Sequence, residues 1–262
     1  MKYGFIGCGN MGSAVVKALC KSTNDIAVTD RTGKAAAFAN EQGIVYLSAQ
    51  AIAEQCDILF LCVKPHMMRE ALQPLCSTLE VKKPMLVSMA AGLTMETIAS
   101  LAGCSLPVIR MMPNTPTAVG KGMIQYCRND LVTDSMLCDW LADMQHCGTL
   151  DELEEHLIDA ASALSGSGPA YMYLLLEALA DGAVACGIPR SKAMQYAAVT
   201  MAGAAEMYLQ TGIHPGALKD AVCSPGGSTI AGIRVLAAQG FRGAAMDCVV
   251  AAYQRNRELG NV

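Results

Sequence analysis

The chain carries, near its N-terminus, the stretch Lys2-Tyr3-Gly4-Phe5-Ile6-Gly7-Cys8-Gly9-Asn10-Met11-Gly12, which decides the class of fold. Residues 2–6 predict a short strand, and a helix is expected to open within the glycine motif. Glycines spaced Gly-x-Gly-x-x-Gly between a strand and a helix permit a tight turn, close approach of a pyrophosphate and close packing of helix on strand. Free N–H groups at the helix start bind phosphates. The sequence therefore predicts a dinucleotide-binding α/β domain.

The first half of the chain alternates short apolar runs with segments of helical period. Runs of about five residues that alternate with helices favour a parallel, doubly wound sheet. The run 58–63 has no polar alternation, as expected of a central strand covered on both faces. The predicted strands are 2–6, 26–29, 58–63, 85–89 and 108–112, and the predicted helices between them include 13–21, 34–42 and 67–75.

From about Glu154 the chain changes to long alanine- and leucine-rich stretches without strand-like runs. These stretches predict helices at 169–186, 190–210 and 228–238. The first of them carries only Glu177 and Asp181 as charged residues, a composition typical of a helix buried on most sides. We therefore predict a dinucleotide-binding domain at residues 1–153 and an all-α oligomerisation domain at residues 154–262, through which copies of the chain associate.

The composition excludes several classes of function. Of 262 residues, 53% are hydrophobic and 16% charged, and the formal net charge is −4. A chain without clustered positive charge is not expected to bind nucleic acid. The twelve cysteines are scattered, with no Cys-x-x-Cys pair, and predict reduced thiols and no metal site. The glycine-rich segment 165–169 interrupts the least charged stretch, so we expect no membrane span and a cytoplasmic location.

Further cofactor contacts are expected at the carboxyl ends of the predicted strands, where open α/β sheets bind their ligands. Asp30 follows the second strand, where an acidic residue accepts hydrogen bonds from the ribose of NAD, whereas Arg31 and Thr32 suit the 2′-phosphate of NADP. Both NADPH and NADH are therefore expected, with NADPH favoured. Lys64 is expected near the cofactor ribose or nicotinamide. The predicted cofactor-binding residues are Ile6, Gly7, Cys8, Gly9, Asn10, Met11, Gly12, Asp30, Arg31, Thr32, Cys62, Val63, Lys64, Pro65, Ser88, Met89 and Ala90.

A second glycine-rich segment, Ser224-Pro225-Gly226-Gly227-Ser228-Thr229, precedes the apolar helix predicted at 228–238. Glycines followed by small hydroxyl residues at a helix start form an anion-binding nest in outline. No lysine or arginine lies within the segment, so it suits one carboxylate better than a multiply charged phosphate. The alternative is an ordinary serine-capped helix start. The predicted substrate-binding residues are Ser224, Gly226, Gly227, Ser228 and Thr229.

With these motifs in place, the whole chain resembles the pyrroline-5-carboxylate reductase family. The resemblance rests on residues 7–12, 63–66, 88–92, 112–116, 164–171, 214–216 and 224–230, and the last stretch is highly specific in combination with the others. It implies an N-terminal Rossmann domain and helical domains that interlock into a homodimer, or into larger rings of dimers. It also implies reduction of 1-pyrroline-5-carboxylate to L-proline by NAD(P)H, the last step of proline biosynthesis.

The resemblance assigns Thr229 the catalytic contact with the ring nitrogen, and the nest the substrate carboxylate. Two positions depart from the family pattern. Ala237 stands where the family signature usually ends in a charged or amide residue. Asp30 precedes Arg31 where many relatives carry a residue that suits NADP better, so the sequence leaves the preference between NADPH and NADH open.

Three other functions are compatible with part of the sequence. An NAD(P)-dependent dehydrogenase of a hydroxyacid shares the domain order, but that family is expected to place a lysine where this chain has Met172. A reductase of a related imine is a further alternative. A non-catalytic NAD(P)-sensing protein would need the loop at 7–12 but not the nest at 226–229, so the nest favours an enzyme.

Overall fold

The computed structural model of the protein describes residues 2–260, and their side chains through residue 258. The chain forms two compact units. Unit 1 contains the described residues up to Pro169 together with those from Ala251 onward, and unit 2 is Ala170–Val250. The chain therefore leaves unit 1 once and returns to it. The predicted division at residues 153 and 154 falls immediately before helix α8 (Glu155–Ser165) and stays a prediction of domain organisation.

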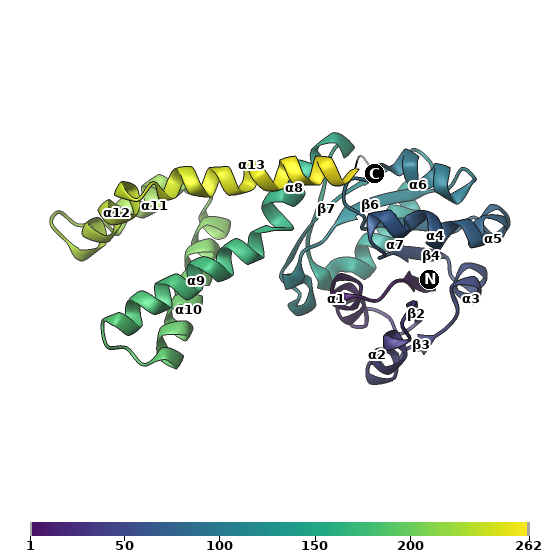
Figure 1. Ribbon diagram of the computed structural model, residues 1–262, viewed down its shortest axis with the longest axis horizontal. Coiled ribbons are helices and arrows are strands. Elements are labelled where there is room, and N and C mark those ends of the chain that lie inside the picture. Colours follow the sequence, from purple (N-terminus) through teal and green to yellow (C-terminus); the bar gives the residue numbers. More distant parts are fainter. Residues whose placement is uncertain (1, 261–262) are drawn as a thin grey trace. The chain divides into compact units, whose positions relative to one another are not determined.

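Unit 1 is built on an eight-stranded sheet with the order β3-β2-β1-β4-β5-β6-β7-β8 (Figure 1). The five predicted strands are all present, and the sequence missed β3, β7 and β8. Neighbouring strands are parallel except β6 and β7, which are antiparallel, so the predicted parallel sheet is in fact mixed. The strands are β1 Tyr3–Ile6, β2 Ile26–Thr29, β3 Val45–Tyr46, β4 Ile58–Leu61, β5 Met85–Ser88, β6 Val108–Met112, β7 Gly122–Arg128 and β8 Gly148–Glu152.

Helices cover both faces of this sheet, because successive side chains of a strand point to opposite faces. Phe5 packs among residues of α1 (Asn10–Leu19), α2 (Lys34–Gln42) and α7 (Asp134–Met144). The next residue, Ile6, packs among residues of the helices on the other face, which are α3 (Ala49–Gln55), α4 (Met68–Leu72), α5 (Cys76–Lys82) and α6 (Met95–Ala102). The α/β doubly wound architecture is therefore confirmed.

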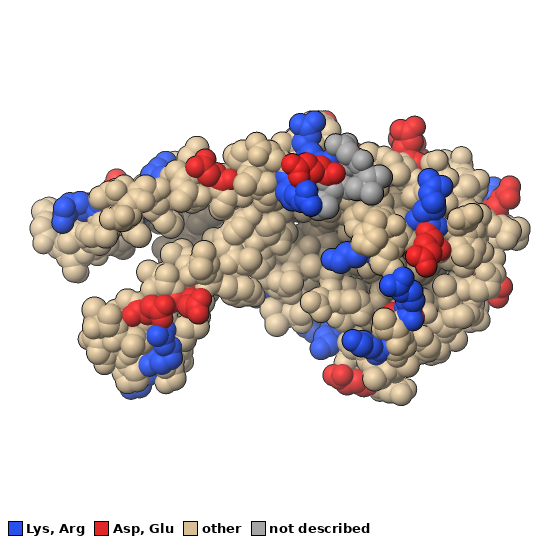
Figure 2. All heavy atoms as spheres, in the orientation of Figure 1, with Lys and Arg blue, Asp and Glu red and all other residues tan. Residues whose placement is uncertain are grey.

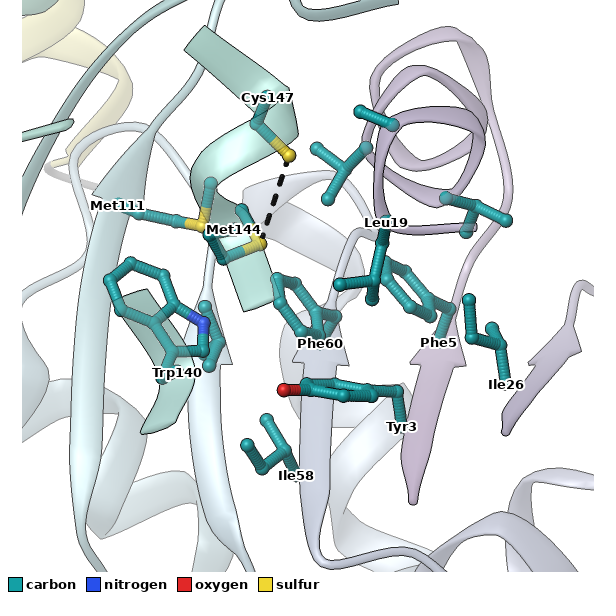
Figure 3. Packing of buried hydrophobic residues seen from close by; sticks show 14 of the residues in the cluster. Tyr3, Phe5, Leu19, Ile26, Ile58, Phe60, Met111, Trp140, Met144 and Cys147 are labelled. Carbon is teal, nitrogen blue, oxygen red and sulfur yellow. Dashed lines mark hydrogen bonds between the residues drawn. The ribbon is translucent and has the colours of Figure 1, made fainter. Parts of the chain in front are cut away.

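The core on the α1 and α7 face is rich in aromatic and sulfur-containing side chains (Figure 3). The rings of Phe5 and Phe60 stack with centroids 4.4 Å apart. The Sγ of Cys147 lies 3.9 Å from the Sδ of Met144. Each such side chain contributes about 1.5–3 kcal/mol when fully buried. This core holds β1 and β4 side by side, and both strands end at the loops described below.

Unit 2 and its flanks are helical throughout the described residues. Its helices are α9 Gly168–Ala185, α10 Arg190–Thr211, α11 Pro215–Ala221, α12 Ser228–Ala238 and α13 Phe241–Gly260, and α13 extends into unit 1. The three helices predicted after residue 154 are confirmed to within a residue at each end. No single described helix has the length and apolar composition of a membrane span, although α12 and α13 taken together, with a bend between them, do.

The apolar side chains of unit 2 are largely uncovered within one chain. Tyr173 is 62% exposed, Leu174 70% and Val199 66%. On the face drawn in Figure 2, charged side chains over these helices are sparse and of mixed sign. The sequence predicted that α9 is buried on most sides, but within one chain Ala180 is the only buried residue of this helix.

Candidate active site

The glycine motif has two glycines between β1 and α1 and a third in the first turn of α1, and each has different surroundings. Gly7 has a left-handed backbone with φ of 97°, and a Cβ there would lie 3.0 Å from the carbonyl of Cys62. A Cβ at Gly12 would lie 2.9 Å from the carbonyl oxygen of Gly7. A Cβ at Gly9 would meet nothing within 4 Å. Gly7 therefore makes the turn, Gly12 permits helix packing, and Gly9 leaves an open side toward a ligand.

The first turn of α1 carries backbone amides without a side-chain cap. Gly9 is the residue at the helix start, and no side chain accepts a hydrogen bond there. By contrast, hydroxyl groups of Ser48, Thr94 and Thr133 cap α3, α6 and α7. The first amides of a helix have no carbonyl partner within the helix, so an uncapped start leaves them free for an anion.

A cavity of about 530 Å³ lies beside this helix start. Among the described residues that line it, Lys64 is the only charged one, and it follows β4 at the carboxyl end of the sheet. Met89 and Ala91 come from the loop after β5 and form a further part of the wall. The lining residues are Gly9, Asn10, Met11, Gly12, Cys62, Val63, Lys64, Pro65, Met89 and Ala91.

Two thiols belong to this region, and both are held in the neutral form. Burial, together with the charge of Asp30, raises the pKa of the Cys8 thiol to about 11. Burial, with a smaller effect of Cys8, raises the pKa of the Cys62 thiol well above its usual value. Neither residue therefore places a thiolate beside the helix start at neutral pH, where a negative charge would repel a phosphate.

Both carboxylate oxygens of Asp30 accept hydrogen bonds from the segment that follows β2. Oδ2 of Asp30 accepts a hydrogen bond from the hydroxyl of Thr32, and Oδ1 accepts one from the amide of Ala35. Slight burial raises the pKa of Asp30, but the donors in this loop outweigh it and lower that pKa below its usual value. Arg31 is exposed, and its nearest carboxylate is Glu70 at 4.0 Å, so its guanidinium remains accessible.

The predicted nest at the start of α12 has the same kind of helix start as α1. Gly226 has a left-handed backbone with φ of 69°, and the amide of Gly227 donates to the carbonyl of Ser224 across 3.0 Å. No side chain caps the helix at Gly227. A Cβ at Gly227 would lie 2.5 Å from the Oγ of Ser224, so the Ser224 side chain would have to rotate away from it. Ser228 and Thr229 are exposed at the first turn.

The structure groups the predicted site residues in three places. Nine of the seventeen predicted cofactor residues line the cavity, whereas Ile6, Gly7, Cys8, Ser88 and Ala90 lie within three residues of a lining residue in the chain. Asp30, Arg31 and Thr32 form a separate group at the end of β2. The five predicted substrate residues are in unit 2.

The sequence analysis missed Ala91, which lines the cavity. The signal that marked Met89 and Ala90, small residues after a strand, extends to Ala91 as well.

The fold and this loop define the class of protein. The sheet order and the glycine loop are those of a Rossmann domain, and residues 2–92 match the family described as NADP oxidoreductase coenzyme F420-dependent. The N-terminal domain is therefore an NAD(P)-binding domain of an oxidoreductase. Residues 155–259 match the family described as pyrroline-5-carboxylate reductase dimerisation.

Comparison with complete proteins narrows the class to one family. The chain is 41% identical to pyrroline-5-carboxylate reductase of Escherichia coli (strain K12) over 264 residues, which cover 98% of each chain. The crystal structure of 1-pyrroline-5-carboxylate reductase from Streptococcus pyogenes superimposes with a TM-score of 0.91 at 30% identity, over 98% of each chain. That of Plasmodium falciparum pyrroline carboxylate reductase, with NADP bound, superimposes with a TM-score of 0.89 at 29% identity, over 99% of this chain and 98% of that one. The chain belongs to the pyrroline-5-carboxylate reductase family, as its motifs predicted.

Proposed function

We propose that the protein reduces the C=N bond of 1-pyrroline-5-carboxylate to give L-proline, with NADPH favoured over NADH as the hydride donor. Family membership supports the reaction. The structure of the Plasmodium falciparum relative with NADP bound supports the cofactor. The observation that carries the proposal is that α1 and α12 both begin at an extended glycine without a side-chain cap, and that a left-handed glycine precedes each of them, Gly7 before α1 and Gly226 before α12. Two such helix starts suit the two anionic ligands of this reaction, a pyrophosphate and a carboxylate.

The residues of unit 1 fit the proposed cofactor. The amides at the start of α1 would hold the pyrophosphate, and the open side of Gly9 leaves room for it. Arg31 would hold the 2′-phosphate of NADPH, since its guanidinium is exposed beside the end of β2. Lys64 and Met89 would line the ribose and nicotinamide half in the cavity. When bound, the cofactor supplies the hydride.

The nest of unit 2 fits the carboxylate of the substrate. The first amides of α12 have no side-chain cap among the described residues and would be available to a ligand at the helix start. The segment 224–229 contains no lysine or arginine that would favour a phosphate. With the carboxylate held there, the hydroxyl of Thr229 would donate a hydrogen bond to the ring nitrogen. The predicted substrate-binding group is thus Ser224, Gly226, Gly227, Ser228 and Thr229.

The chemistry places the largest charge change on that nitrogen. A hydride adds two electrons to the C=N carbon, and the π pair of the double bond moves onto the nitrogen. A substrate that is bound as the protonated imine keeps its proton there and leaves as the secondary amine of proline. The nitrogen of the protonated imine has no free lone pair, so the hydroxyl of Thr229 can donate a hydrogen bond to it only as the π pair arrives there. That hydrogen bond would therefore stabilise the transition state and not the ground state.

We further propose a homodimer, or a ring of dimers, joined through residues 154–262, and a cytoplasmic location. The match of residues 155–259 to a dimerisation family and the exposed apolar side chains of unit 2 support the assembly. The twelve free thiols support a reducing compartment.

The proposed function is tested by following NADPH oxidation with 1-pyrroline-5-carboxylate and identifying the product by amino-acid analysis. We expect stoichiometric L-proline. Parallel reactions offer a related cyclic imine in the forward direction, and a 3-hydroxyacid with NADP in reverse. Turnover of the hydroxyacid alone would overturn the proposal in favour of a dehydrogenase. NADPH binding without turnover of any of these compounds would favour a sensing protein.

A further inference from the structure

A buried arginine joins the sheet of unit 1 to the first turns of α8. Arg110 lies on β6, next to Ser88 of β5 in the sheet register, and is 2% exposed. Its Nη2 lies 2.5 Å from Oδ1 of Asp159, and its Nη1 lies 3.9 Å from Oε1 of Glu155. The two carboxylates are four residues apart on one helix, so they lie on the same face of α8. Arg110 thus fixes that face of α8 against the carboxyl end of β6.

The same two carboxylates also bind the segment between β5 and α6. Oδ1 of Asp159 accepts a hydrogen bond from the amide of Gly92 at 3.4 Å. Oε1 of Glu155 accepts one from the amide of Met95 at 2.6 Å. Gly92 has a left-handed backbone with φ of 74°, so the chain turns sharply at the point where Asp159 holds it. Asp159 therefore contacts Arg110 of strand β6 on one side and the turn at Gly92 on the other.

That turn directly follows the wall of the cofactor cavity. Met89 and Ala91 line the cavity, and the amide of Ala90 donates to the Oγ of Ser88 at 3.3 Å. We call residues 89–92 the wall loop. Its first part is attached to the end of β5, and its last residue, Gly92, is attached to Asp159. Asp159 is not one of the residues that line the cavity.

The energetics favour a fixed position for Asp159. A buried guanidinium is costly unless carboxylates neutralise it, and a charge-assisted pair with one buried partner is strong. Nε of Arg110 has no hydrogen-bond partner among the described residues, so its carboxylate contacts carry a large part of its compensation. Because Arg110 cannot leave the sheet, the aspartate that it holds defines where Gly92 lies.

We propose that Asp159, held by Arg110, is a positioning residue that sets the wall loop against the cofactor. The inference rests on the proposed function of the cavity as the cofactor site. Asp159 acts on the cofactor only through Gly92 and the wall loop. Its loss is expected to weaken cofactor binding while leaving the substrate nest of unit 2 unchanged.

The test compares two variants of Asp159 with a control that loses a bond elsewhere in unit 1. Asp159→Ala removes both the pairing with Arg110 and the acceptor for Gly92, and we expect the Kd for NADPH to rise about tenfold. Asp159→Asn keeps an acceptor oxygen, and we expect a rise of about threefold. In the control, Tyr3→Phe, the lost hydrogen bond is that of the Tyr3 hydroxyl to Asp143 at the start of β1. We expect this control to lower the Tm and to leave the Kd unchanged.

The Kd is measured by the fluorescence of NADPH, without turnover, and the KM for 1-pyrroline-5-carboxylate is measured separately. An unchanged Kd in Asp159→Ala overturns the inference. If that variant does not fold, an unchanged Kd in Asp159→Asn overturns it instead. A rise of equal size in Tyr3→Phe also overturns it, because loss of stability alone would then explain the effect. A wild-type protein that binds NADPH but does not reduce the imine contradicts the proposed function and leaves the Kd comparison decisive for Asp159.

Discussion

The hydroxyl of Thr32 donates a hydrogen bond to Oδ2 of Asp30, so two residues predicted to bind the cofactor bind each other. The amide of Ala35 occupies the other carboxylate oxygen. Each oxygen of Asp30 thus accepts one hydrogen bond from its own loop, and these bonds fix the orientation of the carboxylate. The exposed guanidinium of Arg31 in the same loop favours a cofactor with a 2′-phosphate.

Arg31→Ala is expected to weaken the binding of NADPH much more than the binding of NADH. A charge-assisted bond to a phosphate contributes about 1.5–3 kcal/mol, so the Kd for NADPH should rise roughly ten- to a hundredfold. The matched control is Arg69→Ala, which removes an exposed arginine from α4. Titration of both cofactors against each variant measures the effect. Equal losses for NADPH and NADH would show that Arg31 does not read the phosphate.

Asp30 is expected to make the stability of the protein depend on pH in the acid range. Its pKa in the folded protein is lowered, so the ionised carboxylate stabilises the fold above the usual pKa of about 3.9. That contribution is lost as the pH falls through the lowered pKa. Asp30→Asn should therefore have a lower free energy of unfolding than wild type at about pH 7, and the difference should close toward about pH 2. Urea unfolding across this range measures it, and a difference independent of pH would contradict the expectation.

Gly9→Ala is expected to weaken cofactor binding, whereas Gly12→Ala is expected to destabilise the fold. A methyl group at Gly9 meets no protein atom within 4 Å, so the Tm should stay unchanged while the Kd for NADPH rises at least about tenfold. A methyl group at Gly12 meets the carbonyl oxygen of Gly7, and overpacking of this kind costs about 1–3 kcal/mol of stability. Thermal unfolding and NADPH titration of both variants separate the two effects. A Gly9→Ala variant with wild-type affinity would show that no ligand approaches that glycine.

Thr229→Ala is expected to lower kcat/KM for 1-pyrroline-5-carboxylate by roughly ten- to a hundredfold, as loss of one hydrogen bond of about 1–3 kcal/mol predicts. The Kd for NADPH and the oligomeric state should not change. Thr229→Ser keeps the hydroxyl and should recover part of the activity. Full activity of the alanine variant would show that the Thr229 side chain has no catalytic contact. The backbone of the nest alone would then bind the substrate.

Sedimentation of the protein is expected to give a multiple of its 27.5 kDa chain mass. Leu174→Glu or Val199→Glu places a charge on the exposed apolar surface of unit 2, and should dissociate the assembly or leave it insoluble. Val81→Glu is the matched control, since Val81 is 86% exposed and lies on α5 of unit 1. A stable wild-type monomer that is active would contradict the proposed assembly.

The sequence predicted the elements whose patterns are strong and local. Strand β4 carries an uninterrupted apolar run, helix α12 follows a glycine-rich turn, and the glycines at 7, 9 and 12 have a spacing that physical chemistry explains. Strand β7 was missed because Gly122–Arg128 contains glutamine and arginine, and its pairing with β6 follows from contacts that local periodicity does not encode. Strand β8 was missed because an edge strand such as Gly148–Glu152 carries exposed polar side chains.

The candidate site shows the same division between residues that local patterns predict and residues that depend on the folded structure. Residues next to strand ends were found, because an open sheet binds its ligands there. The internal pairing of Asp30 with Thr32 was not foreseen, since it depends on the loop's folded conformation. The same holds for Asp159, whose partners Gly92 and Arg110 are far from it in the chain.

The return of the chain to unit 1 sets an order of events during synthesis. The side-chain amide of Asn256 donates to the carbonyl oxygen of Asp159, which lies 97 residues earlier in the chain. At a translation rate of about 5–20 residues per second, the ribosome needs roughly 5 to 20 s to add the residues between them. During that interval the nascent chain has made α8 but not the segment of α13 that binds it. Unit 1 is therefore finished last, after the whole of unit 2 has been translated.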